Sequence, residues 1–263
     1  MRRDQIFHLA VEQYQLFLEN FNLSLESDEA EYIHQFRVAV KKLNALKLIL
    51  FNGMDGGADS GLWAFIQPVY KTGGKVRNLQ VILDLLASFV VEPPAEFKLY
   101  LYDRLQEKRL GHDSMAATVE LLTEQQFFNE LKELVDISCI GDGQGLESTI
   151  RSQGARAGQL VRNNPAGEAW HEARRYFKES AHLILLAESV GEQLAHAEDF
   201  FRYREMEQLL GRWHDFFMLN KLVARYELLM GESKAAFWTA FKNEKTETAL
   251  RIEEDVCLLA ATF

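Results

Sequence analysis

This sequence of 263 residues contains little cysteine, little proline and no long apolar run. The two cysteines, Cys139 and Cys257, lack metal-ligand spacing and are expected to be reduced thiols. The four prolines leave long stretches of Leu, Ala, Glu, Gln and Lys, which favour helix over sheet. No uncharged run approaches the roughly 20 apolar residues that span a bilayer, and Asp4, His8 and Glu12 interrupt the apolar run that a signal peptide needs. A cytoplasmic protein without a membrane partner is the simplest interpretation.

The signatures of several enzyme classes are also missing. The sequence contains no P-loop, HExxH, GxSxG or ExExK-type triphosphatase motif. His214-Asp215 leaves a metal-dependent phosphohydrolase open, because an HD pair can ligate metal, but His8, His112 and His196 supply no supporting pattern. We therefore expect a binding protein with no catalytic residues, no metal and no cofactor.

The charge is unevenly distributed along the chain. The formal net charge of −10 argues against a general nucleic-acid binder. Between Tyr32 and Leu83, however, seven basic residues meet only two acidic ones, which gives this segment +5 and leaves −15 for the remainder. Such a basic island is compatible with a local anion site. Its basic residues are Arg37, Lys41, Lys42, Lys47, Lys71, Lys75 and Arg77.

Helical periodicity dominates the whole chain, and no stretch alternates as a strand would. The predicted fold class is therefore all-α. Pro68 and Gly73-Gly74 are expected to bend or divide the third helix, and Gly111 to end the fourth. The expected helices cover about residues 4–21, 28–51, 60–91, 96–110, 113–135, 146–163, 166–195, 198–230 and 233–260.

The stretch EYIHQFRVAVKKLNALKL, residues 31–48, concentrates basic residues on one helix face. His34, Arg37 and Lys41 are spaced i, i+3, i+7 and share a stripe. The opposite side is an ordinary core face, formed by Phe36, Val40, Leu43 and Leu50.

A second copy of this pattern follows in the C-terminal part of the chain, at a repeat offset of about 137 residues. It consists of His171, Arg174 and Lys178 in the stretch WHEARRYFKESAHLILL. A second pair of segments, GKVRNLQVIL and GRWHDFFMLN, has the same offset and matches Gly74 with Gly211, Lys75 with Arg212, Arg77 with His214 and Asn78 with Asp215. Two motifs in one register predict an internal duplication. We expect one domain over 1–263, with an N-terminal helical half (1–140) and a C-terminal helical half (141–263).

These motifs resemble the conserved-histidine α-helical domain (CHAD) family, whose members carry such a His-basic element twice, each followed by a glycine-containing helix. The resemblance spans nearly the whole chain. It implies two four-helix bundles related by pseudo-two-fold symmetry, whose basic helices face a central groove that binds inorganic polyphosphate. Arginines would fork onto phosphate oxygens, lysines would act as point charges and imidazoles would donate hydrogen bonds. The implied ligands are His34, Arg37, Lys41, Lys42, Lys75, Arg77, His171, Arg174, Lys178 and Arg212.

The chain departs from the family pattern in both copies. The basic residue expected ten positions after each histidine is Asn44 in the first copy and Ala181 in the second, and Glu179 occupies an often basic position. The second half is therefore depleted in phosphate ligands. An interaction scaffold with a degenerate anion site remains the alternative to a polyphosphate or polyanion binder, with the phosphohydrolase third.

Overall fold

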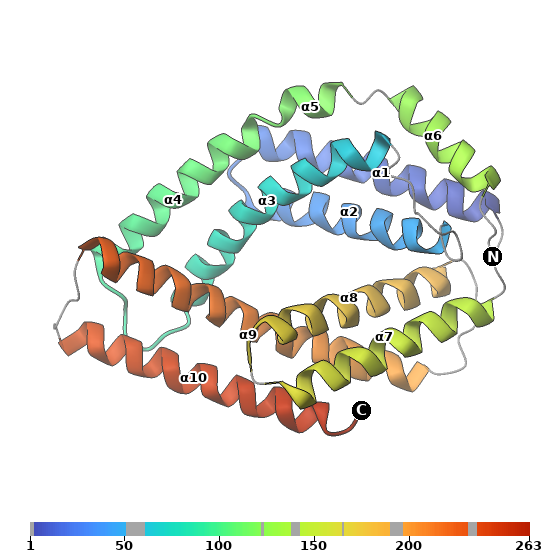
Figure 1. The fold of residues 1–263 in the computed structure, drawn as a ribbon. Helices are drawn as coiled ribbons and strands as arrows, with labels where there is room; N and C mark the ends of the chain where they lie inside the picture. Colours follow the sequence, from blue (N-terminus) through green and yellow to red (C-terminus); the bar gives the residue numbers. More distant parts are fainter. Residues whose placement is uncertain are drawn as a thin grey trace. The chain divides into compact units, whose positions relative to one another are not determined.

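The computed structural model describes residues 3–50, 61–121, 124–137, 143–164, 166–189, 197–230 and 236–263. Within these ranges every regular element is a helix and no strand occurs, so the predicted all-α class is confirmed. None of these helices has the length and apolarity required to cross a membrane. The helices are α1 (Arg3–Glu26), α2 (Ala30–Leu50), α3 (Gly61–Leu86), α4 (Ala95–Asp113), α5 (Ala116–Glu120), α6 (Glu124–Ile137), α7 (Gly143–Asn163), α8 (Glu168–Ser189), α9 (Ala197–Met230) and α10 (Ala236–Ala260) (Figure 1).

The predicted division of the third helix and the predicted end of the fourth at Gly111 are wrong. The helix α3 continues through Pro68 and Gly73-Gly74, because Trp63, Ile66 and Val69 are buried around the proline and offset its local cost. Gly111 lies inside α4, where nothing is within 4 Å of its hypothetical Cβ, so its cost there is only about 1 kcal/mol of helix propensity. The single helix expected over 113–135 is divided into α5 and α6. Boundaries near residues 163, 197 and 260 agree with the predicted ones to within a few residues.

The chain forms two compact units, each assembled from separate segments. Unit 1 comprises Met1–Arg77, Arg109–Gln153 and Glu179–Phe200, and unit 2 comprises Asn78–Lys108, Gly154–Lys178 and Phe201–Phe263. Both units draw on both ends of the sequence. The division into halves 1–140 and 141–263 stays a prediction.

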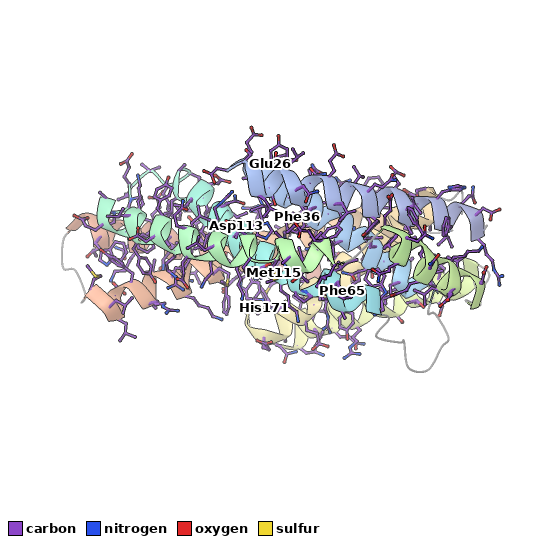
Figure 2. The ribbon with its side chains drawn as sticks, turned by 90° about the horizontal axis from the view of Figure 1, so that it is seen from above. Glu26, Phe36, Phe65, Asp113, Met115 and His171 are labelled. Atoms are coloured by element: carbon purple, nitrogen blue, oxygen red, sulfur yellow. The ribbon has the colours of Figure 1, made fainter. Side chains whose placement is uncertain are left out.

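The core of unit 1 is aromatic and centres on α1 and α2, which pack along each other (Figure 1). Phe17 and Phe21 of α1 meet Phe36 of α2 edge to face, with ring centroids 6.3 and 6.0 Å apart. The end of α4 reaches the same core, because the His112 ring stacks on Phe36 at 5.4 Å and an interplanar angle of 6°. Figure 2 labels Phe36 and Asp113, the last residue of α4. The predicted core face of α2 is confirmed, since Phe36, Val40, Leu43 and Leu50 are at most 2% exposed.

The core of unit 2 lies where α9 and α10 run side by side (Figure 1). Trp238 is its largest side chain and is fully buried. The Trp238 ring stacks on Phe241 at 5.4 Å and meets Phe97 of α4 edge to face at 5.5 Å. The other core members are Leu79, Ile82, Leu86, Leu101, Leu219 and Val223.

Candidate functional site

The basic stripe of α2 lies beside the core rather than on an open surface. His34, Arg37 and Lys41 are all half-buried, while the next face of the helix enters the aromatic core. Half-burial keeps these side chains within reach of a ligand and limits the conformations that they can adopt. All three belong to unit 1, together with Lys42, Lys75 and Arg77.

Arg37 is held against the backbone of α3. Its Nη1 donates to the carbonyl oxygen of Tyr70 at 2.5 Å, and its guanidinium carbon lies 4.2 Å from the centre of the Tyr70 ring. Gly74 makes this close approach possible, because a Cβ there would lie 2.6 Å from Arg37 Nη1. The neighbouring Gly73 has the same role for the core, since a Cβ at that position would overlap the Phe36 ring. The glycine pair thus allows α2 and α3 to approach each other.

His34 lies in the electrostatic field of the other basic residues. Burial lowers the pKa of His34, and the guanidinium of Arg77 is the next largest cause. Lys41 and Arg37 lower this pKa further, while Glu31 partly opposes them. His34 is therefore neutral at pH 7, and its imidazole offers one N–H donor beside three permanent positive charges.

In unit 2, His171 of α8 packs among aromatic rings of α9. The centre of its ring lies 4.8 Å from that of Trp213 and 4.6 Å from that of Phe217. Burial is the main cause that lowers the pKa of His171, followed by His214. Arg174 lies near Gly211, and a Cβ at Gly211 would be 3.9 Å from Arg174 Nε. The matching approach of Arg37 to Gly74 is closer, at 2.6 Å.

His214 completes the polar cluster of unit 2. Its ring meets that of His171 edge to face at 5.2 Å. Its Nδ1 is buried without a hydrogen-bond partner, as is Arg174 Nε. Asp215 Oδ1 lies 3.6 Å from this Nδ1, which is too far for a hydrogen bond.

The remaining predicted ligands lie in more varied surroundings. Lys75 and Arg212 are exposed, and Lys178 is half-buried. Lys42 is exposed and lines a mainly apolar hollow of about 220 Å³ with Leu9, Leu185 and His182, so its surroundings differ from those of the Arg37 stripe. Unit 1 therefore brings His34, Arg37, Lys41 and Arg77 together, and unit 2 brings His171 and Arg174 together with His214, which the motif had not assigned as a ligand.

The departures from the family motif have structural explanations. Asn44 Oδ1 accepts a hydrogen bond from Gln67 Nε2 at 3.1 Å, so this position joins α2 to α3. Ala181 is only 8% exposed and lies in the core side of α8. A long basic side chain at either position would face a neighbouring helix.

The arrangement needed for metal catalysis is not present in the part of the chain that the structure describes. No group of three or more His, Cys, Asp or Glu side chains there could hold a metal ion. His214 and Asp215 thus lack a third ligand among the described residues.

Comparison with known proteins identifies the family. The sequence matches the CHAD domain over residues 8–224. The chain belongs to the CHAD family. Its fold is similar to that in the crystal structure of the CHAD domain from the plant Ricinus communis, with a TM-score of 0.72 and 14% sequence identity over 99% of this chain and 92% of the other. No curated protein has significant sequence similarity to the chain.

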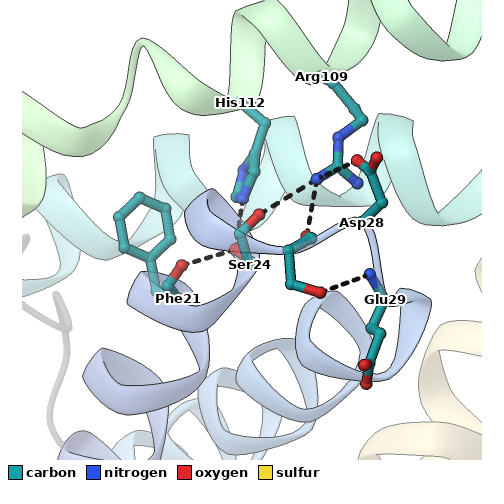
Figure 3. Close-up of polar contacts among 7 residues, drawn as sticks. Phe21, Ser24, Asp28, Glu29, Arg109 and His112 are labelled. Atoms are coloured by element: carbon teal, nitrogen blue, oxygen red, sulfur yellow. Dashed lines mark hydrogen bonds and ion pairs between the residues drawn. The ribbon is translucent and has the colours of Figure 1, made fainter.

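One polar network in this CHAD protein was not found from the sequence. Ser24 Oγ donates its proton to the Phe21 carbonyl oxygen at 2.6 Å and lies 2.9 Å from His112 Nε2 (Figure 3). Because the hydroxyl proton is already used, His112 Nε2 is the donor in the second hydrogen bond and Ser24 Oγ accepts it. Arg109 Nη2 donates to the Ser27 carbonyl oxygen at 2.8 Å, at the end of α1, where a positive charge is favourable. This network joins α4 to α1 and is structural.

The contrast between Gly74 and Gly211 gives a testable prediction. Gly74→Ala should displace the Arg37 guanidinium, because the new Cβ would lie 2.6 Å from Nη1. Loss of one charged hydrogen bond to phosphate would weaken polyanion binding roughly tenfold, whereas folding stability should change little because alanine favours helix by about 1 kcal/mol.

Gly211→Ala is the matched control, since its Cβ would make an ordinary contact at 3.9 Å with Arg174. Binding should be unchanged and the melting temperature should rise slightly. Titration calorimetry and thermal unfolding of both variants measure these effects. Equal losses of affinity would show that Arg37 does not depend on Gly74.

Proposed function

We propose that this CHAD protein is a non-catalytic, internally duplicated module that binds inorganic polyphosphate or a related polyanion. The observation that carries the proposal is the basic cluster of His34, Arg37, Lys41 and Arg77 in unit 1. Three of these side chains carry a positive charge at pH 7, although the protein as a whole has a net charge of −10. A polyanion requires several cationic donors in one place, and Arg and Lys are the residues that supply them to phosphate.

Equivalent contacts in the two units support the duplication. His34 lies in the field of Arg77 in unit 1, and His171 faces His214 at the matching positions of the second copy in unit 2. Arg37 approaches Gly74, and Arg174 approaches Gly211, which again occupy matching positions of the two copies. Two independent pairs in the same register are expected if both helix pairs descend from one ancestral unit. The bundle arrangement itself comes from the family resemblance.

A titration with long-chain polyphosphate tests the proposed function. Wild type should bind at low ionic strength, and its affinity should fall steadily as salt rises, because the contacts are screened charge pairs. Orthophosphate at the same phosphate concentration should bind far more weakly, because one phosphate cannot occupy several cationic positions together. The absence of binding to polyphosphate at low salt would contradict the proposal and favour the interaction scaffold.

A further inference from the structure

The two basic clusters differ chemically at one position. Arg77 acts on His34 in unit 1, whereas the matching position of the second copy holds His214, which faces His171. A guanidinium stays charged at every working pH, but an imidazole changes its charge near neutrality. The cluster of unit 2 therefore has a titratable ring where that of unit 1 has a permanent charge.

The charged groups around the imidazole pair come from three helices and have both signs. The carboxylates offset much of the permanent positive charge, so the local net charge depends on the two rings. These groups are Glu168, Glu172, Arg174 and Arg175 on α8, Asp215 and Lys221 on α9, and Arg156 on α7, which lies 3.0 Å from Glu172.

His171 is accessible, and the hydrogen-bonding capacity of the cluster around it is incompletely used. His171 lines an open hollow of about 540 Å³ together with Glu168, Glu172 and Arg175. In the same cluster, His214 Nδ1 and Arg174 Nε are buried and make no hydrogen bond. Buried polar atoms are normally paired, so two unpaired ones on residues that neighbour His171 indicate that this cluster can accept a polar ligand.

The unliganded cluster resists protonation. Burial lowers the pKa of His171, the charge that His214 can carry lowers it further, and Glu168 only partly compensates. His171 is therefore neutral at pH 7 and above. A phosphate oxyanion beside the ring would favour the charged form and raise this pKa, so binding and protonation strengthen each other.

We infer that His171 and His214 form a proton-coupled phosphate subsite, which engages phosphate on the acidic side of neutrality and is weak above it. In the protonated form each ring carries two N–H donors. Asp215 can accept from Nδ1 of His214, which leaves Nε2 for a phosphate oxygen. The inference rests on the proposed polyanion binding and adds to it the regulation of unit 2 by pH.

The experiment compares wild type with His214→Arg, which gives unit 2 the residue type found at position 77. Long-chain polyphosphate is titrated at about pH 5.5 and about pH 8, because its internal phosphates keep the same charge across this range. Calorimetry in two buffers of different ionisation enthalpy counts the protons taken up. Wild type should bind at least tenfold more tightly at the acidic pH, the effect of about one charge-assisted hydrogen bond, with net proton uptake.

The variants separate this subsite from the other histidines. His214→Arg should bind at about pH 8 as tightly as wild type does at about pH 5.5, with smaller proton uptake. His214→Gln should bind polyphosphate at acidic pH no more tightly than wild type does at alkaline pH. This variant tests the inference if the arginine variant does not fold. His34→Gln, which changes unit 1, should keep most of the pH dependence.

The outcomes distinguish this inference from the proposed function. Strong wild-type binding that is equal at both pH values, without proton uptake, would overturn the inference and leave polyphosphate binding intact. The same pH dependence in His214→Gln as in wild type would also overturn it. No binding at either pH would overturn both.

Discussion

Simultaneous replacement of Arg37 and Arg77 by glutamine should weaken the binding of long-chain polyphosphate about a hundredfold. Each charged hydrogen bond to phosphate contributes on the order of 1.5 kcal/mol at a half-exposed site, and two such losses amount to about 3 kcal/mol. Both residues belong to the unit 1 cluster, where the other positive charge near His34 is that of Lys41. The loss should be largest at low salt and should shrink as salt rises. Titration calorimetry at two salt concentrations measures it.

Removal of two arginines from unit 2 should cost less, although Arg212 matches Lys75 rather than Arg77 in the repeat. Arg174→Gln with Arg212→Gln should reduce affinity only about tenfold at pH 7, because Glu168, Glu172 and Asp215 already lower the positive potential there. Equal losses in the two units would contradict the asymmetry derived from their charges.

The control must remove two positive charges without touching either cluster. Lys132 of α6 and Arg251 of α10 are exposed, so Lys132→Gln with Arg251→Gln should leave affinity nearly unchanged. Lys245 lies outside both motifs, but it is unsuitable because it is only 7% exposed and donates to Asn220 Oδ1. Its substitution would perturb the fold of unit 2. A hundredfold loss in the control pair would mean that net charge alone governs binding.

Acid should destabilise the fold through His112. Burial, with a smaller contribution from Arg109, lowers the pKa of His112 from 6.5 to about 4 in the folded protein. Between these values the unfolded chain binds a proton that the folded chain does not, so stability is lost as pH falls. The unfolding free energy should therefore drop by about 3 kcal/mol between pH 7 and pH 4 on account of this residue alone.

The variant His112→Gln isolates this effect. Glutamine cannot titrate, and its amide retains an N–H donor for Ser24 Oγ, which His112 Nε2 contacts at 2.9 Å. Denaturant unfolding at pH 7 and pH 4 should show a loss about 3 kcal/mol smaller in the variant than in wild type. Parallel losses in the two proteins would contradict the assignment of His112 as a buried, neutral imidazole.

The helices could be predicted from the sequence wherever an apolar stripe continues over several turns. The spacing of Phe36, Val40 and Leu43 was sufficient to place the core face of α2. The interruptions were less predictable, because glycine and proline mark a helix end only when tertiary contacts do not compensate for them. Pro68 is surrounded by buried apolar residues of α3, and Gly111 is followed by His112, which is buried against Phe36, so both remain within helices.

The residues of the candidate site could be predicted from the sequence, but the side chains that surround each of them could not. The repeat register identified the position of His214 through its match with Arg77, yet it did not show that His214 faces His171. Nor did spacing indicate that Lys42 lies beside an apolar hollow. Ser24 and His112 are 88 positions apart in the chain, so no local pattern could connect them.

A crystal structure of the protein with bound tripolyphosphate would test the central claim most directly. The account predicts phosphate oxygens within hydrogen-bond distance of the guanidinium groups of Arg37 and Arg77 and of the His34 imidazole. Occupancy at His171 and His214 should increase in crystals kept at acidic pH. Phosphate bound only elsewhere, for example beside Lys42 in the hollow with Leu9 and His182, would contradict the account.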